Sequence, residues 1–132
     1  MSGVATIVSL MQQLQAAGLQ DKVTFMSLNV FGRTIGPGNT DGRQHNLNHQ
    51  VSITIGKPFK GGVIGGVAPV QGDYGALNVN PQTGAGSAGG SIKAVDTLAA
   101  FGMTMLASVG ADPTAITYPE SSAAVVAAAL AS

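Results

Sequence analysis

Apolar side chains recur at helical spacing in the first part of the chain. Across residues 4–17 the positions between them are mostly small or glutamine, so that one face is apolar and the other is not. The apolar positions are Val4, Ile7, Val8, Met11 and Leu14. Ser2 is a candidate N-cap, and Gly18 stands where a helix commonly ends in left-handed backbone. The pattern predicts a one-faced helix over residues 4–17.

A second helix is predicted over residues 92–109. Its apolar side carries Ile92, Val95, Leu98, Ala99, Met105, Leu106 and Val109. Ser91 stands at the N-cap position, and Gly110 and Pro113 follow as helix-terminating residues. The closing apolar run, residues 123–131, is short, and we interpret it as a short helix packed on the body or as an exposed tail.

Residues 23–31 are apolar on both faces of an extended chain. Val23 and Phe25 fall on one face, and Met26, Leu28 and Val30 fall on the other. This pattern is typical of a strand inside a sheet that helices cover on both sides. A helix followed by such a strand is half of a parallel α/β unit, and one strand makes no sheet. The sequence therefore predicts an α/β protein in which neighbouring strands come from elsewhere.

A second strand is predicted over residues 51–55, where apolar and polar residues alternate. The alternation indicates one buried face. A short strand is also expected around Val63 and Ile64 in the glycine-rich stretch that follows. Between residues 71 and 90 turn-forming residues dominate, and we expect a surface loop there.

Composition narrows the choice of partners. The 132 residues suffice for a single domain, but only 9% are charged, against roughly a quarter in typical soluble domains. Few charged side chains are available to hydrate a large surface, which favours a chain that buries part of its surface against another chain.

The charge balance argues against nucleic-acid binding, because six basic and six acidic residues give a net charge of zero. With no cysteine, disulfides and thiolate metal sites are excluded.

No membrane or export segment is recognised in the sequence. No apolar run reaches the roughly 18 to 20 residues that span a bilayer. The opening Met1-Ser2-Gly3 has neither a basic region nor a cleavage site, so we expect no signal peptide within these residues.

The two histidines, His45 and His49, lie four residues apart in a segment rich in glycine and asparagine. On a helix this spacing would direct both imidazoles towards one metal ion, and Asp41 could add a carboxylate. The flanking glycine and asparagine instead indicate a loop, in which the histidines could simply bond to backbone. No Gly-x-Ser-x-Gly turn is present, and no two carboxylates are paired as an acid/base couple.

Three short motifs follow one another along the chain: Val30-Phe-Gly-Arg-Thr34, Gly42-Arg-Gln-His-Asn46 and Phe59-Lys-Gly-Gly62. Together they resemble a family of exported bacterial proteins of unknown function in the alkaline-phosphatase/sulfatase superfamily, whose usual pattern is EFGRT, GRDHN and VKGG. Their order and approximate spacing match, and so do the preceding helix and the final helix that ends at residues 106–113. The resemblance covers nearly the whole chain.

The resemblance implies that residues 1–132 are the C-terminal part of a larger three-layer α/β/α sandwich. It also implies an exported or periplasmic parent protein. Superfamily relatives hydrolyse phosphate or sulfate esters with divalent metals, such as zinc, that Asp and His hold at strand ends. By this resemblance His45 is the one matched ligand type, while His49 and Asp41 are metal candidates from their spacing in the sequence.

Two departures remove acidic groups from the matched loop. Val30 stands where the family usually has Glu, and Gln44 stands where it has Asp. Valine cannot ligate a metal, and a neutral glutamine is a poor ligand. Arg33 and Arg43 match the pattern and could bind an anion, or could equally brace the loops through backbone carbonyls.

Two hypotheses for the function follow. The first is a non-catalytic module that keeps the scaffold and serves in binding or assembly. The second is the C-terminal part of a metal-dependent phosphate or sulfate ester hydrolase, whose nucleophile lies in sequence outside this chain. Under either hypothesis we expect a homo-oligomer, or pairing with the remainder of a parent protein, because the predicted strand over residues 23–31 would otherwise expose its edges and apolar faces.

Overall fold

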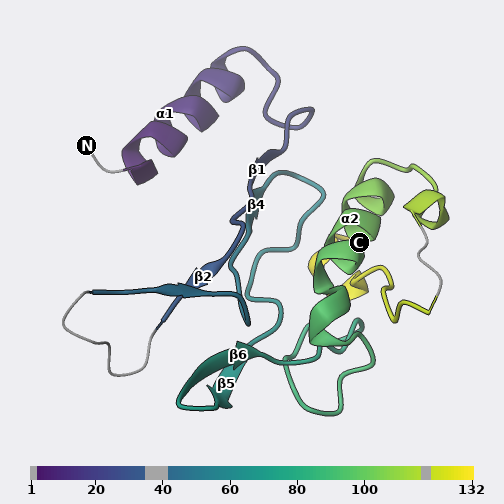
Figure 1. Cartoon of the computed structure of the whole chain (residues 1–132). Helices are drawn as coiled ribbons and strands as arrows, with labels where there is room; N and C mark the ends of the chain where they lie inside the picture. Colours follow the sequence, from purple (N-terminus) through teal and green to yellow (C-terminus); the bar gives the residue numbers. More distant parts are fainter. Residues whose placement is uncertain (1–2, 35–41, 117–119) are drawn as a thin grey trace.

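The computed structural model describes residues 3–34, 42–116 and 120–132. Figure 1 shows α1 at one end of the molecule, α2 and the C-terminus at the other, and short strands between them. In chain order the elements are α1 (Gly3–Ala16), β1 (Phe25–Ser27), β2 (Gly32–Arg33), β3 (His45–Asn46), β4 (Ile53–Ile55), β5 (Val67–Val70), β6 (Asp73–Ala76), η1 (Ala94–Asp96), α2 (Thr97–Ser108), η2 (Pro113–Ile116) and η3 (Ala127–Ala129). Helices and small sheets are thus both present, as the coarse α/β prediction requires. None of the described helices is long and apolar enough to cross a membrane.

The first helix ends as the sequence predicts. Gly18 has φ +68°, in the left-handed region. The Leu19 amide donates to the Leu14 carbonyl at 2.8 Å, and the Gly18 amide donates to the Gln15 carbonyl at 3.0 Å. These two bonds form a Schellman motif, which satisfies carbonyls that the helix end would leave free. The predicted cap Ser2 lies outside the described residues. No residue of α1 is buried.

The expectation of a buried parallel strand over residues 23–31 is not met. Only Phe25–Ser27 are extended as β1, and they pair antiparallel with β4, Phe25 opposite Ile55 and Ser27 opposite Ile53. Met26, Leu28 and Val30 are exposed. The apolar pattern predicts burial of both faces. Within the described residues, no second layer covers these side chains. The strand predicted over residues 51–55 is present as β4, without a fully buried face.

Three two-stranded antiparallel sheets make up the strand content of the described residues: β1–β4, β2–β3 and β5–β6. The β5–β6 hairpin turns at Gln71 and Gly72, which both have positive φ. Two such residues between paired strands suit the right-handed twist of a hairpin. The strand expected at Val63 and Ile64 begins later, at Val67, and β6 occupies part of the predicted surface loop.

The second helix begins five residues later than predicted. Ile92 is extended instead, and its backbone exchanges two hydrogen bonds with Val79, of 2.8 and 3.0 Å. The chain then forms η1, and α2 starts at Thr97, so Ser91 is not the cap. Gly110 ends the helix region with φ +74°, as expected.

The core lies between α2, the Val79 region and the C-terminal segment. Its buried members are Val79, Ile92, Ala100 and Val126, with small alanines of the C-terminal segment packed around them. Thr104 is also buried and connects two of these parts, because its hydroxyl donates to the Ala100 carbonyl and accepts from the Val126 amide at 2.9 Å. The closing apolar run therefore packs on the body, which was the first of its two interpretations, and is not an exposed tail.

Asp96 ties the start of α2 to the C-terminal segment. Its carboxylate accepts hydrogen bonds from the hydroxyl and the backbone amide of Ser122. The hydroxyl bond first, and then the amide bond, lower the pKa of Asp96 from its ordinary value of 3.8. The hydroxyl of Ser122 also accepts from the Lys93 amide at 2.7 Å.

This bonding predicts a loss of stability in acid. Because the pKa of Asp96 is lower in the folded chain than in the unfolded chain, its contribution is present above the unfolded pKa and disappears as pH falls through the folded pKa. We expect the free energy of unfolding, measured by urea denaturation, to fall as pH drops below about 4. Asp96→Asn should flatten this dependence. Asp112, whose pKa Thr114 lowers in the same way, contributes with the same sign, so the double variant with Asp112→Asn should flatten it further. An unchanged slope in both variants would contradict the assignment.

Candidate functional site

The first two matched motifs meet in the β2–β3 hairpin. Gly32 pairs with Asn46, and Arg33 pairs with His45, in antiparallel register. Beyond the strands, the Thr34 amide donates to the Gln44 carbonyl, and the Gln44 amide donates to the Thr34 hydroxyl, both at 3.0 Å. The first two motifs are therefore joined by direct backbone pairing. The sequence placed this whole segment in a loop and did not predict the hairpin.

Arg43 braces this hairpin. Its Nη1 donates to the Thr34 carbonyl at 2.8 Å, across the hairpin. This is one of the two roles that the sequence left open for the arginine, the bonding of a backbone carbonyl. Asp41, the carboxylate candidate, lies outside the described residues.

Arg33, Phe31 and His45 form a stack in which Arg33 and His45 are exposed and Phe31 is half-buried. The rings of Phe31 and His45 lie 3.8 Å apart between centroids, with 27° between their planes. The guanidinium carbon of Arg33 lies 5.3 Å from the centroid of the Phe31 ring, within the range of a cation–π contact. His45 thus has an aromatic partner, and Arg33 adds positive charge beside it.

His49 occupies a different environment, because it is buried whereas His45 is exposed. Its Nδ1 lies 3.3 Å from the Tyr74 carbonyl. A carbonyl oxygen only accepts, so this bond requires a proton on Nδ1. A Cβ at Gly32 would come within 2.5 Å of the His49 ring, so the glycine of the first motif is needed for this packing.

Asn46 anchors the hairpin to β6. It is buried, and its side-chain amide donates to the Asp73 carboxylate at 3.1 Å and to the Tyr74 carbonyl at 2.9 Å. Its side-chain oxygen accepts from the Asn48 amide at 2.8 Å. The sequence gave Asn46 no role beyond its place in the motif, since nothing local indicates that Asp73 lies beside it. Within residues 3–34, 42–116 and 120–132, no three His, Asp or Glu side chains converge as a metal site would need.

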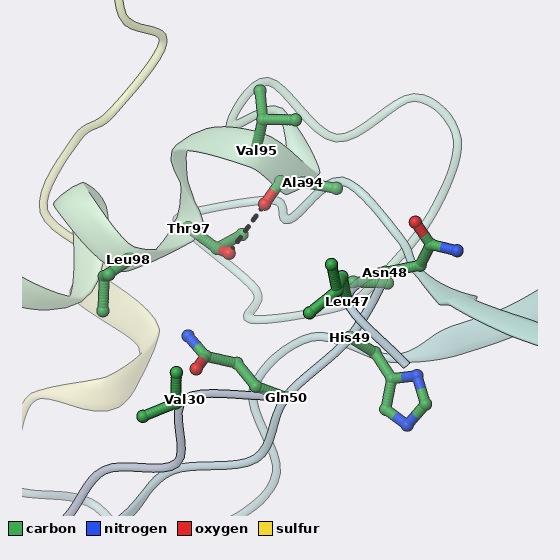
Figure 2. A pocket seen from close by; sticks show the side chains of 10 residues that line it. Val30, Leu47, Asn48, His49, Gln50, Ala94, Val95, Thr97 and Leu98 are labelled. Atoms are coloured by element: carbon green, nitrogen blue, oxygen red, sulfur yellow. Dashed lines mark hydrogen bonds between the residues drawn. The ribbon is translucent and has the colours of Figure 1, made fainter. Parts of the chain in front are cut away.

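A groove lies next to this anchored hairpin. Its volume is about 250 Å³, and its walls come from the segments around β2 and β3, the end of β6 and the start of the α2 region. The lining residues are Val30, Leu47, Asn48, His49, Gln50, Ala76, Ala94, Val95, Thr97 and Leu98. Figure 2 shows Val30 and Gln50 on one side, Thr97 and Leu98 on the other, and the His49 ring pointing away from the space between them.

The groove carries no acidic residue, lysine or arginine. Four of its apolar side chains are exposed to an unusual degree, Val30 at 90%, Val95 at 87%, Leu47 at 82% and Leu98 at 57%. The lining also includes the polar side chains of Asn48, Gln50 and Thr97, so the groove is mixed rather than apolar. It offers no lysine or arginine to a phosphate or sulfate ester, whose charge requires cations or oriented amides.

Comparisons with protein-family models, curated proteins and solved structures found no match to this chain.

Proposed function

We propose that this chain is a non-catalytic α/β module that serves in binding or assembly. In this proposal it is the C-terminal part of an alkaline-phosphatase/sulfatase-like, three-layer sandwich from an exported or periplasmic bacterial protein, with a degenerate metal site. The observation that carries the proposal is Val30. Where the resembled family usually has an acid, this chain has a valine that is 90% exposed and lines an uncharged groove.

The roles of the other motif residues support a scaffold function. Arg43 bonds the Thr34 carbonyl, and Asn46 bonds Asp73 and Tyr74. His49 is packed against Gly32 and faces the Tyr74 carbonyl. These contacts hold the hairpin in place, which is a structural role that involves no reaction. The described residues do not fit a divalent metal, so no catalytic step is assigned to one.

The size of the exposed surface supports assembly. The chain exposes 8681 Å², whereas a compact monomer of its mass exposes about 6,400 Å². Apolar side chains contribute heavily, among them Val4, Val30, Leu47, Val63 and Val95. Monomeric soluble proteins rarely leave large apolar patches uncovered, and such patches mark contact surfaces.

Metal content, hydrolysis and mass test this proposal together. We expect purified protein to hold less than stoichiometric zinc or manganese by mass spectrometry of the metals, and to leave aryl phosphates and aryl sulfates unhydrolysed. Light scattering after size exclusion should give a mass above the 13.1 kDa of one chain.

The competing hydrolase hypothesis predicts a different result. One metal ion per chain that disappears in His45→Ala, but persists in the neighbouring exposed variant Gln44→Ala, would favour it. Ester hydrolysis that depends on His45 in the same way would overturn the non-catalytic assignment. A monodisperse monomer would overturn the assembly role.

A further inference from the structure

The C-terminal segment, residues 121–131, has little regular structure of its own. It contains the short turn η3 and one β-bridge at Leu130. Its hydrogen bonds to the rest of the chain reach Lys93, Asp96, Thr104, Pro81, Pro58 and Lys60. Figure 1 shows the segment in yellow beside α2. The segment therefore takes its conformation from the other described residues, which we call the body.

The body in turn needs the segment to complete its core. Val126 of the segment is 7% exposed and packs with Val79, Ile92 and Ala100 of the body. Four alanines of the segment, Ala123, Ala124, Ala128 and Ala129, lie around this cluster. If the segment left its place, these buried apolar side chains would meet water, which is unfavourable. A body without its own segment would therefore bind another segment of the same sequence.

The body holds the end of the segment mainly through backbone groups. Phe59 and Leu130 form an antiparallel bridge. The bonds on its two sides run from the Lys60 amide to the Ala129 carbonyl at 3.0 Å and from the Ala131 amide to the Pro58 carbonyl at 2.8 Å. An added peptide pairs with an extended chain in the same way. These contacts are identical whichever copy supplies the segment, so a second copy's segment fits the same place.

The connection to the segment is strained at Glu120. This residue has φ +65°, in the left-handed region that a residue with a Cβ adopts only at a cost. The other described non-glycine residue with positive φ, Gln71, lies in a hairpin turn that requires this conformation. Glu120 lies in no such turn between paired strands. Opening the connection would relieve this strain, and strained connections of this kind favour exchange of the segment between copies.

We propose that the C-terminal segment of one copy docks on the body of a second copy, in the place that the second copy's own segment leaves. The inference rests on the assembly role proposed above and identifies the partner as the chain itself. Mutual exchange closes a symmetric dimer in which each body keeps every contact with a segment. What changes is the backbone at Glu120, which opens and loses its strain.

Cysteine cross-linking tests the exchange, because the chain has no cysteine of its own. The bonds on its two sides make Phe59 and Leu130 a non-hydrogen-bonded pair, whose Cα atoms lie about 4.5 Å apart in such bridges, within reach of a disulfide. The double variant Phe59→Cys/Leu130→Cys, oxidised and run under denaturing conditions, should give a covalent dimer of twice 13.1 kDa. A segment docked on its own body would give a linked monomer instead.

A matched double variant controls for chance collisions. Val4→Cys/Leu130→Cys keeps the same cysteine in the segment and moves the other one to α1, at the opposite end of the molecule from the C-terminus (Figure 1). Val4 is 69% exposed, so its thiol is accessible. We expect several-fold less covalent dimer from this variant.

A variant at the connection tests the exchange without oxidation. Glu120→Gly removes the Cβ and with it the strain of the closed form, so it should weaken dimerisation by about tenfold. Glu120→Ala removes the same carboxylate but keeps the Cβ, and should leave dimerisation close to wild type. Light scattering over a dilution series measures both dissociation constants, and circular dichroism checks that each variant keeps its fold.

The results separate this inference from the assembly role on which it rests. An oligomer whose Phe59→Cys/Leu130→Cys variant gives only the linked monomer, or links no better than the control, would overturn the exchange and leave assembly standing. Equal dissociation constants for Glu120→Gly and Glu120→Ala would overturn strain at Glu120 as its cause. A monomeric wild-type chain would overturn both the exchange and the assembly role.

Discussion

Gly90→Ala should lower the free energy of unfolding by about 2–4 kcal/mol. A Cβ at this position would lie 2.6 to 2.7 Å from backbone atoms of Asn78 and Val79. No rotation of a side chain relieves such a contact, so the backbone itself must move. The affected backbone is that of Val79, which exchanges two hydrogen bonds with Ile92 in the core. Urea denaturation followed by circular dichroism measures the change in midpoint.

Gly89→Ala is the matched control. A Cβ at Gly89 meets nothing within 4 Å, and its φ lies outside the left-handed region that favours glycine. We expect its stability to stay within about 0.5 kcal/mol of wild type, with a small gain from the stiffer unfolded chain. Equal losses in the two variants would mean that the close approach of residues 78–79 to Gly90 is not formed in solution.

Ile92→Ala should cost about 2–5 kcal/mol, a large share of the stability of a small domain. Ile92 has no exposed surface and is the largest fully buried side chain among the described residues. It packs with Val79, Ala100 and Val126, so its loss leaves a cavity where three separate parts of the chain meet. Thermal unfolding should show a lower midpoint and reduced cooperativity.

A graded variant and an exposed control define this result. Ile92→Val removes one methylene and should cost about 0.5–1.5 kcal/mol. Val63→Ala, at a position 89% exposed, should change little. The assignment of Ile92 to the core fails if the alanine variants at positions 92 and 63 unfold at similar urea concentrations.

The candidate site was only partly readable from the sequence. His45, Arg33 and Arg43 could be named from their motifs, but their partners could not. The Phe31–His45 stack and the bond from Asn46 to Asp73 join residues 14 and 27 positions apart. Side-chain type records which groups can bond, whereas the pairing of β2 with β3 and the approach of β6 decide which groups meet.

The exposed apolar strand is the most informative difference between expectation and structure. Residues 23–31 carry apolar side chains on both faces, which predicted burial between helices. Among the residues that the structure describes, β1 pairs with β4 alone, and Met26 and Leu28 remain exposed. The pattern correctly reports that these side chains gain free energy on leaving water, but it cannot say which chain provides the covering surface.

The sequence by itself determined the features that depend on neighbouring residues. The helical spacing of residues 4–17, the ends at Gly18 and Gly110 and the presence of extended backbone within residues 23–31 and 51–55 are of this kind, although the strands themselves are shorter. They follow from periodicity and from backbone freedom within one or two turns.

Only the tertiary structure decided the start of α2, the antiparallel pairing of the strands and the position of the groove. Ile92 fits the helical pattern, yet it is held extended because pairing with Val79 buries it completely. Such contacts form between segments that are distant in sequence. A local pattern does not show which distant segment will make the contact.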